Sequence, residues 1–593
     1  MKSLELRLLI LLLTASLGIA AEIREDAAEF LKMYNSIVQP LSRVANEAAW
    51  QAAIDVTDEH TGTRIGSAEA LSTFAGSVYV IEKSKKLLAH KDQLDDLTVR
   101  QLEAILLGAA ESPGTIPEII AEKVRAEARQ QSAQDSFVFQ YKTSSGSSNI
   151  VTPNIITDIL IKSTNMEERR AIWEASREIG IPLRPGLVNL QRLRNRVAQE
   201  MGFNSYFAMK VADFGMSVEE MKALTERLFT DIRPLYEQLH CWARHRLAER
   251  YGQPIPKTIP AHWLGNRWGQ EWPGLVKGTA LEGDIKKTPE WIVEQGERFY
   301  VSLGWQQLPK SFYAKSDLYE LPSGDPRRKN THASAWHIDL ENDVRSIMSV
   351  KSDFAWLETT HHELGHIYYY LAYSNPNVPV LLRTGANRAF HEAIGDLIGI
   401  AARQVPYLKE IGLIDPAAKI NSLDYLLDEA LQAIVFIPWS AGVMTSWEHD
   451  FYELNLPTNQ YNQRWWEYVA KYQGITPPEP RDERFCDPAT KTHINDDAAE
   501  YYDYALAFAI KYQLHMHIAK NILKQDPRSC NYYGNQEVGR FLWEILKVGK
   551  TADWRKLLQE TTGQEISAQP MLEYFQPLMA YLKKENEGRT VGW

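Results

Sequence analysis

The residues with the clearest chemical potential lie in HHELGH at 361–366, inside a helical pattern that runs from about 353 to 373. Residues four apart share one face of a helix, so His362 and His366 can offer two imidazole nitrogens to a single metal ion. Glu363 is adjacent to His362 and could act as general base on a water bound to that metal. The HExxH spacing therefore predicts a zinc site.

A carboxylate that could complete this site lies in HEAIGD at 391–396, on a second predicted helix from about 386 to 404. A catalytic zinc ion takes three protein ligands and keeps one position open, and Glu392 would complete a set of two histidines and one glutamate. Asp396 falls one helical turn later and could accept the second N–H of a ligand histidine, which would fix its tautomer. The alternative for Asp396 is an ordinary acid on the helix surface.

Peptide hydrolysis at such a site creates negative charge on the former carbonyl oxygen, which needs hydrogen-bond donors or a metal close by. The candidate donors are His332 in HASAW, and His493 and Tyr504 in KTHINDDAAEYYDYALAF. Spacing alone does not select them, because a single histidine or tyrosine in a helical protein is more often structural.

The elements that must position these residues are mostly helical. Apolar residues recur at spacings of three and four over 22 to about 129, 166–179, 187–201 and 217–250, with few glycine or proline breaks. The segment TSSGSSNIVTPN, at 143–154, is predicted to be a surface loop.

One segment differs, because THASAWHIDL and VRSIMSV have strand patterns on either side of the turn Glu341-Asn342-Asp343. The predicted fold class is therefore all-α with a short β-hairpin near the active site. No internal repeat or shift in composition divides residues 22–593, which we expect to form a single catalytic domain.

The first 21 residues have the order of a secretory signal peptide. Lys2 and Arg7 precede an apolar run at 8–13, and small residues close the segment at Ala20 and Ala21. The run is too short to span a bilayer comfortably, which makes a retained membrane anchor the weaker interpretation. No later segment reaches about 18 uninterrupted apolar residues. We expect a secreted or periplasmic protein without stable membrane insertion.

Composition narrows the class of function. A net charge of -11 and a pI near 5.8, without a basic stripe, argue against nucleic-acid binding, which needs a dense basic surface. The three cysteines, Cys241, Cys486 and Cys530, are too few for a disulfide scaffold, and the sequence leaves open whether any two of them pair. Few cysteines and no Asn-x-Ser/Thr acceptor favour a bacterial periplasm over a eukaryotic secretory route.

Beyond these motifs, six blocks resemble those of the angiotensin-converting enzyme family, in that family's order along nearly the whole mature sequence. They are PAHWLGNRWGQEW, HASAW, HHELGH, GANRAFHEAIGD, YNQRWWEYVAKYQG and the closing VGW. The resemblance implies an ellipsoidal, mostly helical fold with a deep central channel, and N-terminal lid helices that restrict access to slender peptides. It also implies a peptidyl-dipeptidase, which releases dipeptides from the free C-terminal end of peptides.

The resemblance implies one zinc ion per catalytic domain. The matching ligand positions are His362, His366 and Glu392, with Glu363 as the base. Two histidines and a glutamate around an open position suit zinc best, although cobalt or manganese could substitute.

The remaining site residues are implied by the same match. His493 and Tyr504 correspond to residues that bind substrate and stabilise the transition state. His332 and Ala333 correspond to contacts along the substrate backbone.

A pocket for the substrate's terminal carboxylate is also implied, and the matching positions are Gln270, Lys491 and Tyr501. One cation and two neutral donors suit a buried carboxylate. Considered alone, Lys491 would more often be a solvated charge.

The chain departs from the family pattern in three ways. The stretch from HIYYYL to GANRAF is longer than expected, and one extra residue follows His493, so the register at Tyr501 could be shifted by one. Arginines that mediate chloride activation in many members are replaced by Asp503 and Val469, which predicts weak or absent activation. The alternative is that Asp503 pairs with a nearby base and organises the site in the same way. The family's disulfide set is also missing.

The leading prediction is a monomeric zinc peptidyl-dipeptidase that hydrolyses the penultimate peptide bond of substrates with a free C-terminal carboxylate. Two alternatives share the metal site: a helical HExxH oligopeptidase that cuts internally, and a carboxypeptidase that releases single residues. A third is a peptide-binding homologue without catalysis, which the intact ligand and base positions argue against.

Overall fold

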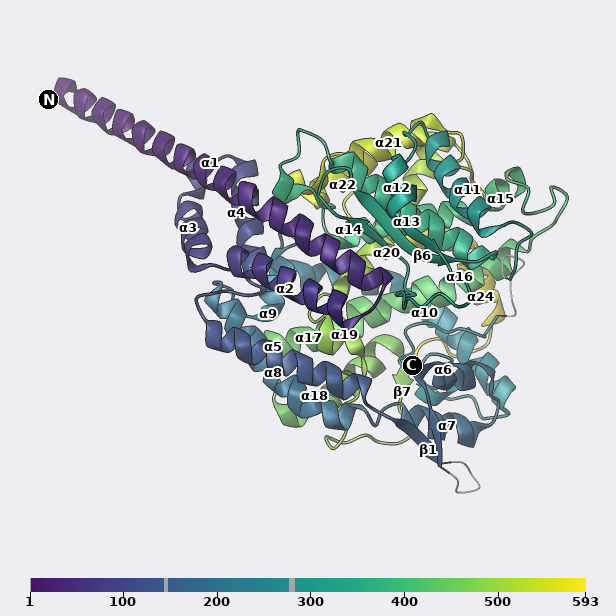
Figure 1. Ribbon diagram of the computed structural model, residues 1–593. Helices are drawn as coiled ribbons and strands as arrows, with labels where there is room; N and C mark the ends of the chain where they lie inside the picture. The colour runs from purple at the N-terminus through teal and green to yellow at the C-terminus, as the bar shows by residue number, and fades with distance from the viewer. Residues whose placement is uncertain (1, 143–147, 277–282) are drawn as a thin grey trace.

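The computed structural model describes residues 2–142, 148–276 and 283–593 of the chain, and helices dominate it (Figure 1). The N-terminal third contains α1 (Lys2–Ile54), α2 (Asp58–Ala75), α3 (Val78–Leu88), α4 (Asp96–Ala109), α5 (Pro117–Asp135), α6 (Pro153–Lys162), α7 (Met166–Ala175) and α8 (Gly180–Glu200). The middle contains α9 (Tyr206–Ala212), α10 (Val218–Tyr251), α11 (Pro289–Ser302), α12 (Lys310–Lys315), α13 (Phe354–Tyr373), α14 (Arg388–Ala402) and α15 (Val405–Glu410). The last third contains α16 (Ser422–Ile437), α17 (Thr445–Tyr452), α18 (Tyr461–Tyr468), α19 (Thr492–Asp496), α20 (Tyr502–His517), α21 (Gln536–Leu546), α22 (Trp554–Thr562), α23 (Gln569–Tyr574) and α24 (Gln576–Glu585).

The first four helices pack around an apolar cluster of their own. Its buried members are Ala27, Phe30, Leu31, Tyr34, Val38, Val80, Leu87, Leu102 and Ile105. In Figure 1 the N-terminal part of α1 extends away from the rest of the molecule. The long helices predicted between residue 22 and about residue 129 are confirmed.

Two central helices, α13 and α14, pack directly against each other, and α14 also packs against α20. Both begin with an N-cap: the side chain of Asp353 accepts the N–H of Trp356 at 2.7 Å, and that of Asn387 accepts the N–H of Phe390 at 2.7 Å. Such caps satisfy N–H groups that have no partner within the helix. The predicted helices at 353–373 and 386–404 are therefore confirmed.

Two glycines permit this close packing. A β-carbon on Gly365 of α13 would lie 3.2 Å from the Cα atom of Gly395 of α14 and 3.1 Å from the hydroxyl of Tyr300. The hydroxyl of Tyr300 donates to the carbonyl of His361 at 2.6 Å. Small residues at the crossing thus bring the HExxH helix and the helix of the third predicted ligand together.

The predicted hairpin is confirmed by strands β5 (Ser334–His337) and β6 (Val344–Val350), which pair antiparallel. β4 (Asp317–Tyr319) adds to the other edge of β6 in parallel orientation. The two other sheets are the antiparallel pair β1 (Phe139–Lys142) and β2 (Ser148–Val151), and the parallel pair β3 (Ile259–Pro260) and β7 (Ile475–Thr476). The fold is therefore mostly helical with small sheets, as predicted.

Two sequence-based boundaries were wrong. Strand β2 and the start of α6 lie within 143–154, which was predicted to be a loop, and residues 143–147 fall outside the described residues. Helix α8 begins at Gly180 instead of 187, with Pro182 in its first turn, where a proline is tolerated, and Pro185 inside the helix.

Among the described residues, the helical run Ser422–Tyr452 is long and apolar enough to cross a membrane. However, 78% of its most apolar window is buried inside the protein, as in a core helix.

The three cysteines, Cys241, Cys486 and Cys530, are all buried and free. This answers the question of pairing that the sequence left open.

Candidate active site

The three predicted metal ligands come together where α13 meets α14. The Nε2 atoms of His362 and His366 lie 2.9 Å apart, and a carboxylate oxygen of Glu392 lies 3.8 Å from Nε2 of His362. One ligand atom from each residue lies within 4.8 Å of the other two. Among the described residues, this is the group of histidine, cysteine and acidic side chains that could hold a metal ion.

The chemistry of this donor set fits zinc. Two imidazole nitrogens and one carboxylate leave a coordination position open, as catalytic zinc sites require. His362, His366 and Glu392 all line one side of a cavity of about 500 Å³, so the open position would face space that a substrate can occupy.

Asp396 lies where the sequence placed it, one turn after Glu392 on α14. One of its oxygens lies 3.2 Å from Nδ1 of His362, and the other accepts from Lys511 at 3.1 Å. Burial alone would raise the pKa of Asp396, but Lys511 and His362 hold it well below its ordinary value. An ionised Asp396 keeps the other nitrogen of His362 directed at the metal position.

His391 is a contact that the sequence reasoning missed. Its Nδ1 lies 2.7 Å from Nδ1 of His366, and burial lowers its pKa to about 3. The only signal was its place beside Glu392 in HEAIGD, and the bend of the chain that brings it to His366 is not visible in a sequence pattern. In the tautomer whose Nδ1 carries no proton, neutral His391 can accept the Nδ1–H of His366, a role similar to that of Asp396 toward His362.

The predicted base, Glu363, lines the same cavity and is only 7% exposed. Burial raises its pKa to about 7, although the nearby His362 opposes the rise. A carboxylate with a pKa near neutrality can both take up and return a proton at neutral pH. His332 and Ala333, just before β5, also line this cavity, and Nδ1 of His332 lies 2.7 Å from the carbonyl oxygen of Ala333.

A second group of predicted residues forms around Lys491. Its ammonium donates to Oε1 of Gln270 at 2.8 Å and lies 5.3 Å from the ring centroid of Tyr501. Lys491 is 5% exposed, and burial together with the charge of Arg267 lowers its pKa to about 7. The structure therefore brings together the three residues matched to a carboxylate pocket.

His493 and Tyr504 adjoin this group. The rings of His493 and Tyr504 both contact Tyr501, with centroids at 5.0 and 4.8 Å, and the Tyr504 hydroxyl lies 3.4 Å from Nε2 of His493. Burial, with the charge of Lys491, lowers the pKa of His493 to about 4, so its ring is neutral at neutral pH.

The turn before α20 contains a residue in the left-handed region. Ala499 has a φ of 63°, and its N–H donates to a carboxylate oxygen of Glu448 at 2.7 Å. Two residues later, Tyr501 lies against His493 and Lys491.

The sequence left open the alternative that Asp503 pairs with a nearby basic residue, and the structure provides such a residue. It is 2% exposed and pairs with Arg388 at 3.4 Å. Burial raises the pKa of Asp503 well above its ordinary value, while the Arg388 guanidinium opposes that rise. Sequence reasoning did not single out Arg388, which lines the metal cavity.

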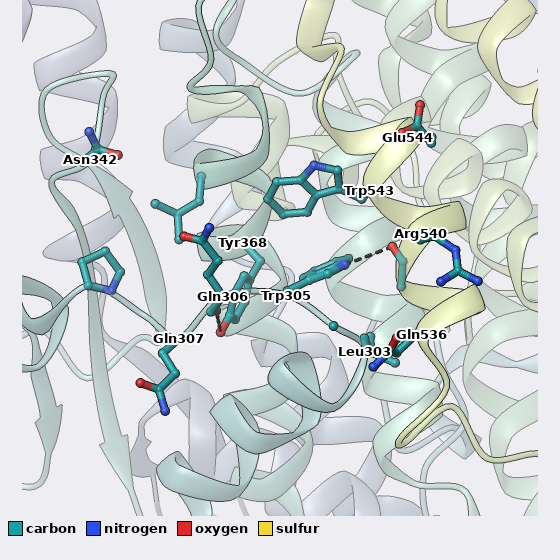
Figure 2. A pocket seen from close by; sticks show the side chains of 14 residues that line it. Leu303, Trp305, Gln306, Gln307, Asn342, Tyr368, Gln536, Arg540, Trp543 and Glu544 are labelled. Atoms are coloured by element: carbon teal, nitrogen blue, oxygen red, sulfur yellow. Dashed lines mark hydrogen bonds between the residues drawn. The ribbon is translucent and has the colours of Figure 1, made fainter.

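A separate cavity of about 590 Å³ lies against the other side of α13 (Figure 2). Trp305, Tyr368 and Trp543 contribute to its lining, and only Arg540 and Glu544 among its lining residues are charged. Its lining contains none of the predicted site residues.

A mostly helical fold in which an HExxH helix packs against a helix bearing a third, carboxylate ligand defines the class of HExxH zinc metallopeptidases. Within that class the chain belongs to the angiotensin-converting enzyme family, because the model of that family matches residues 21–593. The family is zinc-dependent and acts on peptides.

Individual relatives support this assignment. The chain is 30% identical to the angiotensin-converting enzyme of Theromyzon tessulatum over 604 residues, covering 96% of this chain and 93% of that protein. It is 33% identical to the enzymes of Mesocricetus auratus and Rattus norvegicus over 463 residues, covering 74% of this chain. The match spans about a third of the length of these two mammalian proteins, 34% in each.

Proposed function

We propose that the protein is a peptidyl-dipeptidase, which hydrolyses the second peptide bond from the C-terminus and releases a dipeptide. The observation that carries this proposal is the buried Lys491, held by Gln270 beside Tyr501. Tyr501 contacts Tyr504, whose ring centroid lies 6.0 Å from the guanidinium carbon of Arg388 in the lining of the metal cavity. Among the described residues no carboxylate forms an ion pair with Lys491, so its buried ammonium is prepared for a carboxylate from a ligand.

His362, His366 and Glu392 would hold the zinc ion, while Asp396 and His391 orient the two histidines. When bound, zinc would polarise the scissile carbonyl and lower the pKa of a water molecule at its open position.

Glu363 takes a proton from the attacking water and later delivers it to the leaving amine. Its raised pKa favours both transfers at neutral pH. The negative charge that develops on the carbonyl oxygen is stabilised by donors from Tyr504 and from His493. His332 and Ala333, which also line the cavity, contact the substrate backbone.

Substitution of Glu363 by glutamine tests the mechanism, because it keeps the shape of the side chain and removes the base. We expect at least about a hundredfold loss of kcat, with the zinc content unchanged. A variant that retains native turnover with a full complement of zinc would contradict the assignment of Glu363.

We further propose that residues 1–21 direct export to the periplasm or outside the cell and are then removed. The family match begins at residue 21, where the predicted signal ends. N-terminal sequencing of the protein recovered from the exported fraction tests this, and a chain that still begins at Met1 would contradict it. The mature chain is proposed to act as a monomer.

A further inference from the structure

Arg388 stands between the third metal ligand and the proposed transition-state donor. It is the first residue of α14, one turn before Glu392, and residues four apart share a helix face. Its side chain lines the metal cavity, and its guanidinium carbon lies 6.0 Å from the centroid of the Tyr504 ring.

The guanidinium of Arg388 binds the segment that leads into Tyr504 at three points. It donates two hydrogen bonds to Asp497, at 2.8 and 3.0 Å, and one to Glu500 at 3.2 Å. Its Nε lies 3.4 Å from Asp503, the residue immediately before Tyr504. One side chain of α14 thus contacts three acidic side chains in the segment from 497 to 503.

The three carboxylates are not equivalent. Glu500 has a second cationic partner, Lys210, at 3.3 Å. Asp503 is 2% exposed, and neither of its oxygens has a hydrogen-bond partner among the described residues, so Arg388 is its charge partner there. A buried acid with one cationic neighbour depends strongly on that neighbour, and the neighbour's position depends on the acid.

We propose that the Arg388–Asp503 pair positions Tyr504, with the guanidinium holding the buried carboxyl group of Asp503 as its partner. The pair links the start of α20, which carries Tyr504, to α14, which carries Glu392. It therefore fixes the tyrosine hydroxyl relative to the metal position. This inference rests on the proposed role of Tyr504 in supporting the transition state.

Kinetic coupling is the first test. We expect Arg388→Gln and Asp503→Asn each to lower kcat at least about tenfold, with KM changed less than about threefold and zinc content unchanged. Arg388→Lys, which keeps the charge without the planar fork, should fall between Arg388→Gln and the native enzyme. Tyr504→Phe should lose about a hundredfold.

If Arg388 acts through Tyr504, the double variant Arg388→Gln/Tyr504→Phe should be no slower than Tyr504→Phe alone, within about threefold. Multiplicative losses would overturn the inference, because they would mean that the two residues act independently. Arg403→Gln, at the other end of α14 and outside the metal cavity, is the matched control and should keep native kcat.

Chemical rescue is the second test, and a purely structural role would not produce it. Asp503→Gly removes the carboxylate and leaves space next to Arg388, which sodium formate should fill. We expect a saturable rise in kcat of about fivefold or more with formate at ionic strength held constant by sodium sulfate. Neither the native enzyme nor the double variant Arg388→Gln/Asp503→Gly should respond.

Absence of rescue in a folded, zinc-loaded Asp503→Gly enzyme that has lost activity would contradict the role of the Asp503 carboxyl group as the partner of Arg388. The native enzyme is measured alongside throughout. If the native protein releases no dipeptide, the proposed function itself fails. If the native protein is active and the variants are equally active, only the proposed role of the Arg388–Asp503 pair fails.

Discussion

A β-carbon added to Gly395 would lie 2.8 Å from Cε1 of His362, closer than side chains approach one another in proteins. Glycine at this position of α14 therefore leaves the room in which the imidazole of a metal ligand sits. The next glycine on the helix, Gly399, differs, because a β-carbon there would make ordinary contacts of 3.6 Å with Glu358.

We predict that Gly395→Ala weakens zinc binding by about ten- to a hundredfold, the usual cost of disturbing the surroundings of a metal ligand. Competition with a chelator measures the affinity. Gly399→Ala is the control and should bind zinc like the native protein. Equal affinities for all three proteins would show that the ring of His362 can move without loss.

Lys491 predicts a pH dependence. Its pKa is lowered to about 7, so it is charged below that pH and neutral above it. If the ammonium pairs with the substrate carboxylate, its deprotonation must produce a fall in kcat/KM for free-acid peptides on the alkaline side of pH 7, opposite to the rise expected as Glu363 ionises. Arginine stays charged throughout, so Lys491→Arg should remove this fall. Persistence of the same fall in Lys491→Arg would assign it to another group.

We predict that chloride changes kcat/KM of the native enzyme less than about twofold at fixed ionic strength. At the first of the two replaced arginine positions, Asp503 pairs with Arg388 at 3.4 Å. Three residues before the second position, Val469, the indole N–H of Trp466 donates to the buried carboxylate of Asp487 at 2.7 Å. Both nearby cations are already engaged, Arg388 by acidic side chains that include Asp503 and Arg481 by Asp487, so neither offers a free charge to an additional anion. A several-fold rise on replacing sulfate by chloride would refute this prediction.

The cysteines give a prediction about stability. All three are buried and free, and burial raises the pKa of Cys486 and of Cys530 to about 12. A thiol reagent at pH 8 should therefore label no cysteine in the folded protein and all three after denaturation. A reducing agent should leave the melting temperature unchanged. Fewer than three thiols in the denatured, unreduced protein would reveal a disulfide.

The metal group was predictable from the sequence because most of it is local. His362 and His366 are related by the geometry of one helix turn, and Asp396 follows Glu392 by one turn of another. The β5–β6 hairpin was also predictable, because strand-like sequences flank a short turn.

What the sequence did not reveal depends on contacts between distant segments. Arg388 became significant only when the fold placed it beside the turn containing Asp503, and His391 only when it met His366. Strand β2 was missed because three of its four residues are exposed, which leaves no alternation of buried and exposed positions to detect.

The most direct test of the central claim is mass spectrometry of the products formed from a free-acid decapeptide and from its C-terminal amide, with and without a chelator. The account predicts stepwise loss of dipeptides from the free acid only, abolished by the chelator and restored by zinc. Internal cuts in both peptides, or release of single residues, would leave the zinc site intact and contradict the proposed dipeptidase activity.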